Sequence, residues 1–383
     1  MATKKKLLQA AAGSAGGAGG LDITDVFSTY LYDGTGAAQT ITNGIDLADE
    51  GGLVWTKVRS NGFSHALIDT ERGVNNFLKI NHNYDVVIDN QSLSYGMLEI
   101  QKRFPFIEII HHPISKDFKF ELESANNFSY KLSRYRWYSF LKMQNKVAKN
   151  INKIITPSKN SLRDIVEDFG ANKENIKVIN NGLDIDIFIP YKEIKRTPFK
   201  LITTASADVA LKGLDYTLKS LSVLAKEFPE ISLLVIGKMK NDGHTSRLID
   251  ELSIQDRVTF KTDLTKEEIA KEYASSSIAI VSSLYEGFGY PVIEAMSCEI
   301  PLIATNTASI PELVGEFANL ITPKSENELS ESIKNIFNNY QEFEKIAESG
   351  RQHIIDNFNW LKITLEYEEM IFKTIQDFKN ANL

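Results

Sequence analysis

The sequence predicts an α/β protein with two units built on parallel sheets, preceded by a small β-rich segment. From about residue 77 onward, short apolar runs alternate with stretches of helical character. A glycine-rich turn at 286–289 follows one such run and leads into an apolar helix. The length of 383 residues is enough for about two to three domains.

The first 73 residues differ in character from the rest of the chain. Residues 10–20 are only Ala, Gly and Ser, so we expect residues 1–20 to form a flexible tail. Residues 21–73 contain β-like runs at 25–32, 39–42 and 52–57, and a turn signal at Asp33-Gly34-Thr35-Gly36. This segment is therefore predicted to be a small β-rich unit.

Residues 74–183 are predicted to form the first α/β unit. Strands are expected at 84–89, at 107–113, where the strand runs into a loop, and at 153–157 and 176–179; helices are expected at 94–104, 126–151 and 158–169. Residues 184–360 are predicted to form the second unit, with helices between its strands and a helical end spanning 326–379. Its strands are expected at 200–204, 232–236, 258–261, 277–281, 302–305 and 320–322.

Composition excludes several classes of protein. A net charge of −7 argues against general binding of nucleic acid. The single Cys298 rules out an internal disulfide framework, and no His and Cys spacing is typical of a metal site. No apolar run approaches the ~20 residues of a membrane span, and the N-terminus lacks a secretion signal. We expect a cytoplasmic protein.

Two carboxylates, Glu286 and Glu294, stand eight positions apart across a glycine turn and a helix start. Such a turn presents backbone N–H groups to an anion. Two glutamates alone would be ordinary surface groups, but here the string Glu-Gly-Phe-Gly-Tyr-Pro follows an apolar strand. The segment resembles the Glu-x7-Glu motif of retaining, family 4 glycosyltransferases with the GT-B fold. In that fold two Rossmann-like domains face a cleft, and the last helix, here 361–383, crosses back onto the first domain.

The resemblance implies a nucleotide diphosphate sugar, linked to UDP or GDP, as donor, and neither a cofactor nor a metal. Glu294 would accept the ribose hydroxyls, and Glu286 would contact the transferred hexose. Lys212 would hold the diphosphate at a helix start. Family members carry an arginine five residues earlier, where this chain has Ala207. The expected donor-binding residues are Lys212, Gly237, Glu286, Gly287, Phe288, Gly289 and Glu294.

His111 and His112 end a strand of the first unit, at the sheet edge where α/β sites form. A lone histidine is more often structural. By its position in the family, His111 is expected to face the donor sugar, and we group it with Glu286 and Lys212 as the catalytic residues.

A basic run interleaved with aromatic residues covers 130–153 and contains no acidic residue. It suits an anionic membrane surface, where a lipid-linked acceptor would be met. It equally suits a solvated face beside an aromatic core stripe. The expected partners are the nucleotide sugar and a glycan or lipid-linked acceptor, and the first of these two interpretations adds a peripheral contact of 130–153 with the inner face of the membrane.

The resemblance runs from about Val74 to the C-terminus, yet a GT-B first domain normally begins with a strand and a glycine loop that are absent here. The segment 21–73 instead resembles the N-terminal part of phage tail proteins. We therefore expect a truncated first domain, or a diverged version of its early units. The alternative function is a phage-derived structural or carbohydrate-binding fusion protein with an inactive transferase remnant.

Overall fold

The computed structural model describes residues 85–123, 125 and 127–382, and the backbone of three short strands before them. Contacts divide the chain into two units, and the boundary between them lies after Tyr84. The sequence had predicted this boundary after residue 73. In the first unit, β1 (Leu53–Thr56), β2 (Ala66–Asp69) and β3 (Phe77–Lys79) form an antiparallel sheet. β1 lies within the predicted run 52–57. The predicted tail 1–20 and the runs 25–32 and 39–42 lie outside the described residues.

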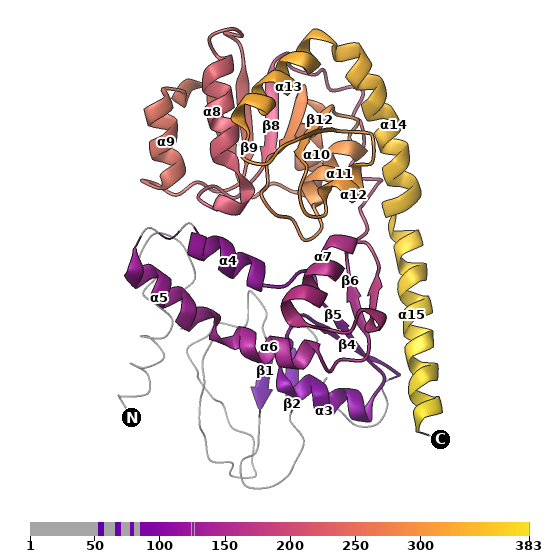
Figure 1. Ribbon diagram of the computed structural model, residues 1–383. Coiled ribbons are helices and arrows are strands. Elements are labelled where there is room, and N and C mark those ends of the chain that lie inside the picture. Colours follow the sequence, from indigo (N-terminus) through magenta and orange to yellow (C-terminus); the bar gives the residue numbers. More distant parts are fainter. Residues whose placement is uncertain are drawn as a thin grey trace, which may run out of the picture. The chain divides into compact units, whose positions relative to one another are not determined.

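The second unit, residues 85–383, contains two parallel sheets, as the sequence predicted. We call residues 85–179 the first lobe and residues 200–358 the second lobe (Figure 1). The strands of the first lobe follow one another in sequence order across its sheet: β4 (Val87–Asn90), β5 (Phe106–Ile109), β6 (Ile154–Thr156) and β7 (Ile176–Val178).

Helices cover one face of the first-lobe sheet and enclose an apolar core that includes Phe106, Val147 and Phe169. The predicted helix 126–151 is divided by a 3-10 turn at Tyr138–Phe140, and the predicted helix 158–169 ends in a π-helical turn at Ile165–Phe169. The helices of this lobe are α3 (Tyr95–Arg103), α4 (Ser115–Glu123), α5 (Phe128–Trp137), α6 (Leu141–Ala148) and α7 (Lys159–Asp164).

The six-stranded sheet of the second lobe has the order β10-β9-β8-β11-β12-β13. The strand order reverses between β8 and β11, which are direct neighbours. In open α/β sheets this reversal opens a crevice at the carboxyl ends of the strands. The strands are β8 (Lys200–Thr204), β9 (Ser232–Ile236), β10 (Val258–Lys261), β11 (Ile278–Val281), β12 (Leu302–Thr305) and β13 (Asn319–Ile321).

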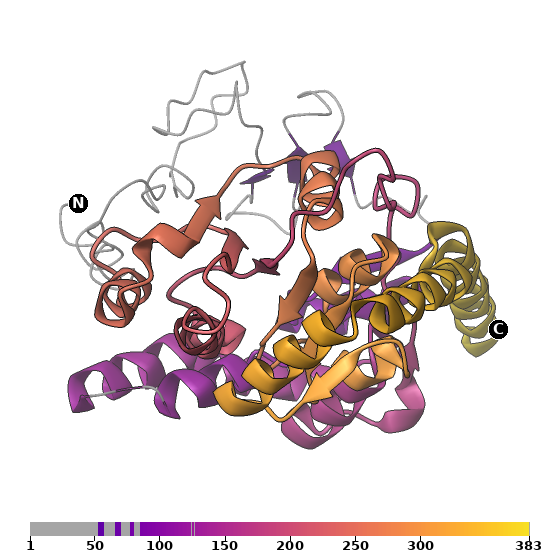
Figure 2. The same ribbon diagram turned by 90° about the horizontal axis from the view of Figure 1, so that it is seen from above.

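Both faces of this sheet are covered, which explains why its central strands are apolar without alternation. α8 (Leu214–Leu224), α9 (His244–Leu252) and α13 (Glu326–Asn338) pack on one face. The other face is covered by α10 (Lys266–Ala274), α11 (Tyr290–Ser297), α12 (Ile310–Val314) and α14 (Tyr340–Phe358). Figure 2 shows α13 and α14 from above.

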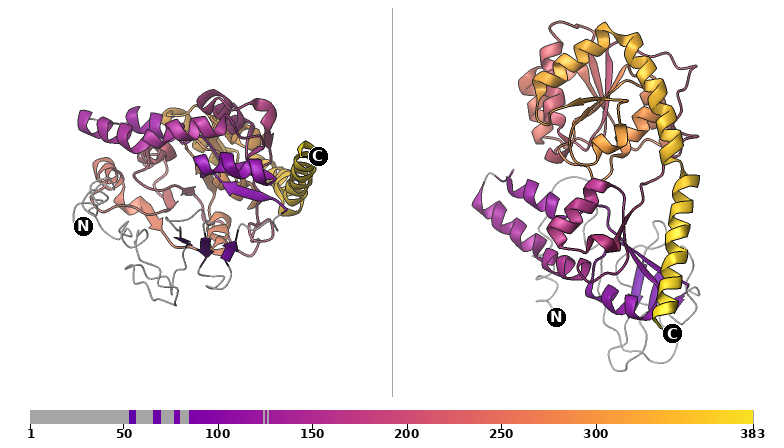
Figure 3. Two further views of the ribbon diagram at one scale, coloured as in Figure 1. Left: turned by 90° about the horizontal axis from the view of Figure 1, so that it is seen from below. Right: turned by 45° about the vertical axis from the view of Figure 1, so that its right-hand side comes forward.

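The last helix, α15 (Trp360–Ala381), leaves the second lobe and runs along the first (Figure 3). Its Ile363 and Met370 are buried against Ile107, Ile155 and Ile179 on the second face of the first-lobe sheet. An ion pair of 2.6 Å joins Lys153 to Asp377. None of the helices in the described residues has both the length and the apolar character needed to cross a bilayer.

Candidate functional site

The β11–α11 loop, residues 282–289, connects a fully buried strand to an apolar helix at the strand-order reversal. Within the described part of the chain, the N–H groups of Gly287, Phe288 and Gly289 donate to no protein acceptor. The Ser309 hydroxyl fixes the loop by donating to the Glu286 carbonyl oxygen at 2.8 Å. The loop therefore presents three consecutive donors at the start of a helix, where the helix dipole also favours an anion.

Lys212 and Glu286 come together although 74 positions separate them. The Lys212 ammonium lies 2.7 Å from a Glu286 carboxylate oxygen, which also accepts a 2.7 Å hydrogen bond from Ser283. Their side chains are 30% and 11% exposed. The site thus holds a cation and an anion that are partly shielded from water, so their interaction is stronger than on an open surface.

The backbone conformation of Gly213 allows the turn that carries Lys212 to approach the end of β11. Its backbone is left-handed, with φ of +62°, and a Cβ built there would lie 2.0 Å from the Ser282 carbonyl oxygen. Only glycine fits such a conformation at such a close approach. The turn after β8 therefore packs directly against the end of β11.

Glu294 lies on α11, and one of its carboxylate oxygens is 3.5 Å from the Tyr273 hydroxyl. Burial raises the pKa of Glu294 to about 7, although Tyr273 and Lys266 both lower it. Phe288 is buried in the core beside Phe358. Gly237 follows β9, and its N–H group already donates to the Lys261 carbonyl oxygen at 2.9 Å, so that donor is engaged in the sheet.

His111 follows β5 at the carboxyl edge of the first-lobe sheet. Its Nε2 lies 2.7 Å from Asn90 Oδ1, and its backbone N–H donates to Gln91 Oε1 at 2.8 Å. Burial, followed by the neighbouring His112, lowers the pKa of His111, which favours the neutral imidazole at pH 7. His112 lies 3.0 Å from an Asp117 carboxylate oxygen.

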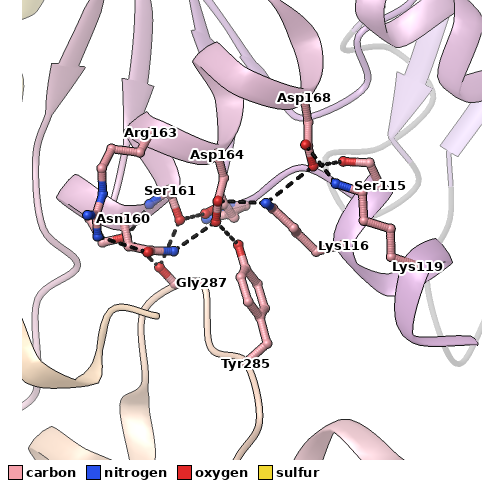
Figure 4. Close-up of polar contacts among 12 residues, drawn as sticks. Ser115, Lys116, Lys119, Asn160, Ser161, Arg163, Asp164, Asp168, Tyr285 and Gly287 are labelled. Carbon is pink, nitrogen blue, oxygen red and sulfur yellow. Dashed lines mark hydrogen bonds and ion pairs between the residues drawn. The ribbon is translucent and has the colours of Figure 1, made fainter. Parts of the chain in front are cut away.

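The first lobe contacts the β11–α11 loop at Gly287 (Figure 4). The Gly287 carbonyl oxygen lies 2.8 Å from the Ser158 hydroxyl and 3.0 Å from the Ser161 hydroxyl. A Cβ built on Gly287 would lie 3.0 Å from His112 Nδ1 and 3.2 Å from the His111 carbonyl oxygen. The fold therefore brings His111 to the loop that carries Glu286.

Several residues of this region were not selected from the sequence. Ser158, Ser161 and Asp164 lie on or beside α7, and Tyr285 precedes Glu286 in the loop. Ser158 looks like an ordinary helix cap, which it also is, since it accepts from the Ser161 N–H group at 2.9 Å. The sequence carries no local signal for their contacts across the lobes. In the described residues, no group of three or more His, Cys, Asp or Glu side chains is arranged to hold a metal.

Comparison with known families covers most of the chain. A family model for glycosyl transferases group 1 matches residues 187–353. A model for glycosyltransferase family 4 matches residues 61–187. A model for a domain of unknown function matches residues 22–98, which includes most of the segment before the first lobe and extends into α3.

Curated relatives are also transferases. The MMP alpha-(1->4)-mannosyltransferase of Mycolicibacterium hassiacum is 36% identical over 296 residues, which is 76% of this chain and 71% of that protein. The D-inositol 3-phosphate glycosyltransferase of Mycolicibacterium smegmatis is 28% identical over 182 residues. That second match spans 45% of this chain and 42% of the relative's own length.

Solved structures with the same fold include sucrose-phosphate synthase from Thermosynechococcus elongatus, with a TM-score of 0.64 and 19% identity. The match covers 77% of this chain and 74% of that one. Anabaena HepE in complex with UDP gives a TM-score of 0.62 at 20% identity, and the match covers 76% and 79% of the two chains. These structures have the GT-B fold, which confirms the predicted fold class.

Proposed function

Because the chain belongs to the family 4 (group 1) glycosyltransferases, we propose that it moves a hexose from a nucleotide diphosphate sugar to a glycan or lipid-linked acceptor, with retention of anomeric configuration. One observation supports this proposal above the others. Lys212, paired with Glu286, follows β8, and the loop whose three consecutive N–H groups donate to no acceptor among the described residues follows β11, so both lie at the strand-order reversal of the second lobe. Together they supply the charge and the donors that a diphosphate needs.

The donor would enter with its phosphates between Lys212 and the amides of Gly287, Phe288 and Gly289. In the free protein the Lys212 ammonium is held by Glu286 at 2.7 Å. A diphosphate carries more negative charge than one carboxylate, so it would attract the lysine and leave Glu286 to accept hydroxyls of the hexose. The ion pair thus keeps both groups in place before the donor arrives.

Glu294 would accept the two ribose hydroxyls through its carboxylate. Its partly buried position on α11 and its pKa of about 7 suit a carboxylate that stays shielded from water until a ligand supplies hydrogen bonds. The solved Anabaena HepE holds UDP-glucose, and the curated relatives include a mannosyltransferase. The proposed donor is a nucleotide diphosphate sugar, and UDP and GDP are the nucleotides to compare.

Transfer would break the bond between the sugar C1 and the diphosphate while the acceptor oxygen bonds to C1 from the same face. The acceptor proton would pass to an oxygen of the leaving diphosphate. Lys212 and the loop amides would stabilise the charge that develops on the leaving group, which is the principal catalytic contribution here. His111, neutral and held by Asn90, would face the transferred sugar from the first lobe.

Titration calorimetry with UDP, GDP and ADP tests the donor site directly. We expect one nucleotide to bind wild type with micromolar affinity. Glu294→Ala should weaken this binding by at least tenfold, because two ribose hydrogen bonds are lost. Binding to wild type should strengthen as the pH rises through about 7, since the hydroxyls prefer the ionised carboxylate and the pKa of Glu294 is near that value.

Glu331→Ala is the matched control, because Glu331 is 75% exposed on α13. It should bind the nucleotide as wild type does. If none of the three nucleotides binds wild type, the donor site is not functional. That result would favour the alternative of a structural or carbohydrate-binding fusion protein with a transferase remnant.

We further propose that the region 130–153, together with Phe128 at the start of α5, contacts an anionic membrane surface. Phe128 and Leu132, one helical turn apart, are 81% and 53% exposed. Lys131 and Arg136 are exposed on the two flanks of this strip. Other residues of the run are used in packing, since Tyr135 and Tyr138 contact the Phe118 ring.

Sedimentation with vesicles tests this surface. We expect more protein to bind vesicles containing phosphatidylglycerol than pure phosphatidylcholine vesicles, with salt weakening the difference. The double variant Phe128→Ser, Leu132→Ser should reduce the bound fraction several-fold, because it removes the apolar strip. Val223→Ser, at a side chain that is 54% exposed on α8, is the control. Equal binding to both vesicle types would contradict the proposal.

A further inference from the structure

Successive residues of the β11–α11 loop contact different lobes. Glu286 faces Lys212 within the second lobe. Tyr285 and Gly287, on either side of it in the chain, contact the first lobe (Figure 4). A displacement of Tyr285 or Gly287 would therefore displace the Glu286 carboxylate between them. The first lobe is in a position to set the geometry of a group on the second.

Tyr285 contacts the carboxylate of Asp164, which other residues of the first lobe already hold in place. The Tyr285 hydroxyl donates to Asp164 Oδ2 at 2.8 Å, and Asn160 Nδ2 donates to the same oxygen at 2.8 Å. The other oxygen of Asp164 pairs with the Lys116 ammonium at 2.7 Å. Burial, with Asp164 beside it, raises the pKa of Tyr285, so the phenol stays protonated and remains a donor.

A second carboxylate one helical turn away shares the same lysine. Lys116 lies 3.5 Å from Asp168, which also pairs with Lys119 at 3.0 Å and accepts a 2.6 Å hydrogen bond from Ser115. Two lysines of α4 thus hold two carboxylates of the α7 region, and their charges offset the repulsion between the carboxylates. The side chain of Asp164 is only 11% exposed, and this network holds it in one orientation.

Further contacts between the lobes lie beside the same loop. The Ser161 hydroxyl lies within hydrogen-bond distance of the carbonyl oxygens of His111 and Gly287, at 2.9 and 3.0 Å. Because it has one proton, it can donate fully to only one of them, while Ser158 donates to Gly287. On the second lobe, Glu312 accepts from the backbone N–H groups of Lys159 and Asn160, both at 3.0 Å, and so caps α7 from outside.

We propose that Asp164 is a positioning residue for transfer, which fixes Glu286 by holding the hydroxyl of Tyr285 across the lobes. The inference rests on the proposed donor role of Glu286. Nucleotide binding by the second lobe does not need the contact, since Lys212 and Glu294 both belong to that lobe. Alignment of the hexose with a group on the first lobe such as His111 does need it. A small misplacement of a reacting group has a large effect on rate.

A double-mutant cycle with Tyr285→Phe and Asp164→Ala tests the proposal. Each single variant should lower kcat about tenfold, and the double variant should be no slower than the slower single variant, because both remove the same contact. The dissociation constant for the nucleotide should stay within about twofold of wild type. Tyr340→Phe is the matched control. It also removes a tyrosine hydroxyl, but that hydroxyl donates to the Ser277 carbonyl oxygen within the second lobe.

Amide hydrogen exchange supplies a readout that needs no substrate. Both single variants should speed exchange at the Leu284 amide of this loop, which donates to the Leu211 carbonyl oxygen at 2.7 Å, and leave β8 and β11 as protected as in wild type. Tyr340→Phe should leave the loop unchanged. Unchanged loop exchange together with additive or absent effects on kcat would overturn the proposal. Failure of wild type to bind any nucleotide would instead overturn the proposed function, while the exchange result would still report on the contact itself.

Discussion

Replacing Lys212 by methionine should lower the turnover of the transferase by about 10²- to 10³-fold, the effect of removing one charged group that stabilises a leaving anion. Methionine keeps much of the volume of lysine and removes the ammonium that lies 2.7 Å from Glu286. Binding of the nucleoside diphosphate should weaken at the same time, since the ammonium would contact its phosphates. Initial rates and titration calorimetry measure the two effects separately.

Lys219→Met provides the control on α8, the helix that follows the turn carrying Lys212, because Lys219 is 43% exposed and lies 3.7 Å from Glu326, away from the loop. It should retain the rate and affinity of wild type. If Lys212→Met kept full turnover, the charge on the leaving diphosphate would have to be stabilised elsewhere. Lys212 would then be a structural partner of Glu286 only.

Replacing Gly213 by valine should destabilise the second lobe by about 3–5 kcal/mol, from backbone strain and overpacking together. The residue has a φ of +62°, and its Cβ would approach the Ser282 carbonyl oxygen to 2.0 Å. A β-branched side chain is especially unfavourable in that conformation. Thermal unfolding should show a Tm lower by about 10 °C.

Gly96→Ala is the matched control for Gly213→Val. Gly96 lies in α3, and a Cβ built there would meet only the Ser94 hydroxyl oxygen, at 3.6 Å. Alanine should raise stability by about 1 kcal/mol, because it is the better helix former and no strain opposes it. A Tm for Gly213→Val equal to that of wild type would contradict the close approach of the two turns.

Much of the second lobe could be predicted from sequence because its signals are local. β8, β9, β10 and β12 have the residue bounds that the apolar runs predicted. The strand, glycine turn and helix around Glu286 also lie where predicted, since turn chemistry and helix starts depend on neighbouring residues. The fold class followed from the same alternation of strands and helices.

The first lobe was harder to predict because its helices depend on distant contacts. α4 was not predicted, and its Lys116 and Lys119 are ordered by Asp164 and Asp168 of the α7 region. To predict the pairing of Lys212 with Glu286, one also needs the order of the strands, since β8 and β11 are neighbours only in the folded sheet. No window of sequence contains both partners of such a contact.

Backbone preference and hydrophobic pattern act over a few residues, so the strands, the glycine turn and the types of side chain at the site follow from the sequence alone. Which of those side chains meet depends on the folded arrangement of the chain. It placed Glu286 against Lys212, and it placed Tyr285 and Gly287 against Asp164 and Ser158 of the other lobe. The reason is physical: such contacts depend on strand order and on packing between lobes, which no local interaction specifies.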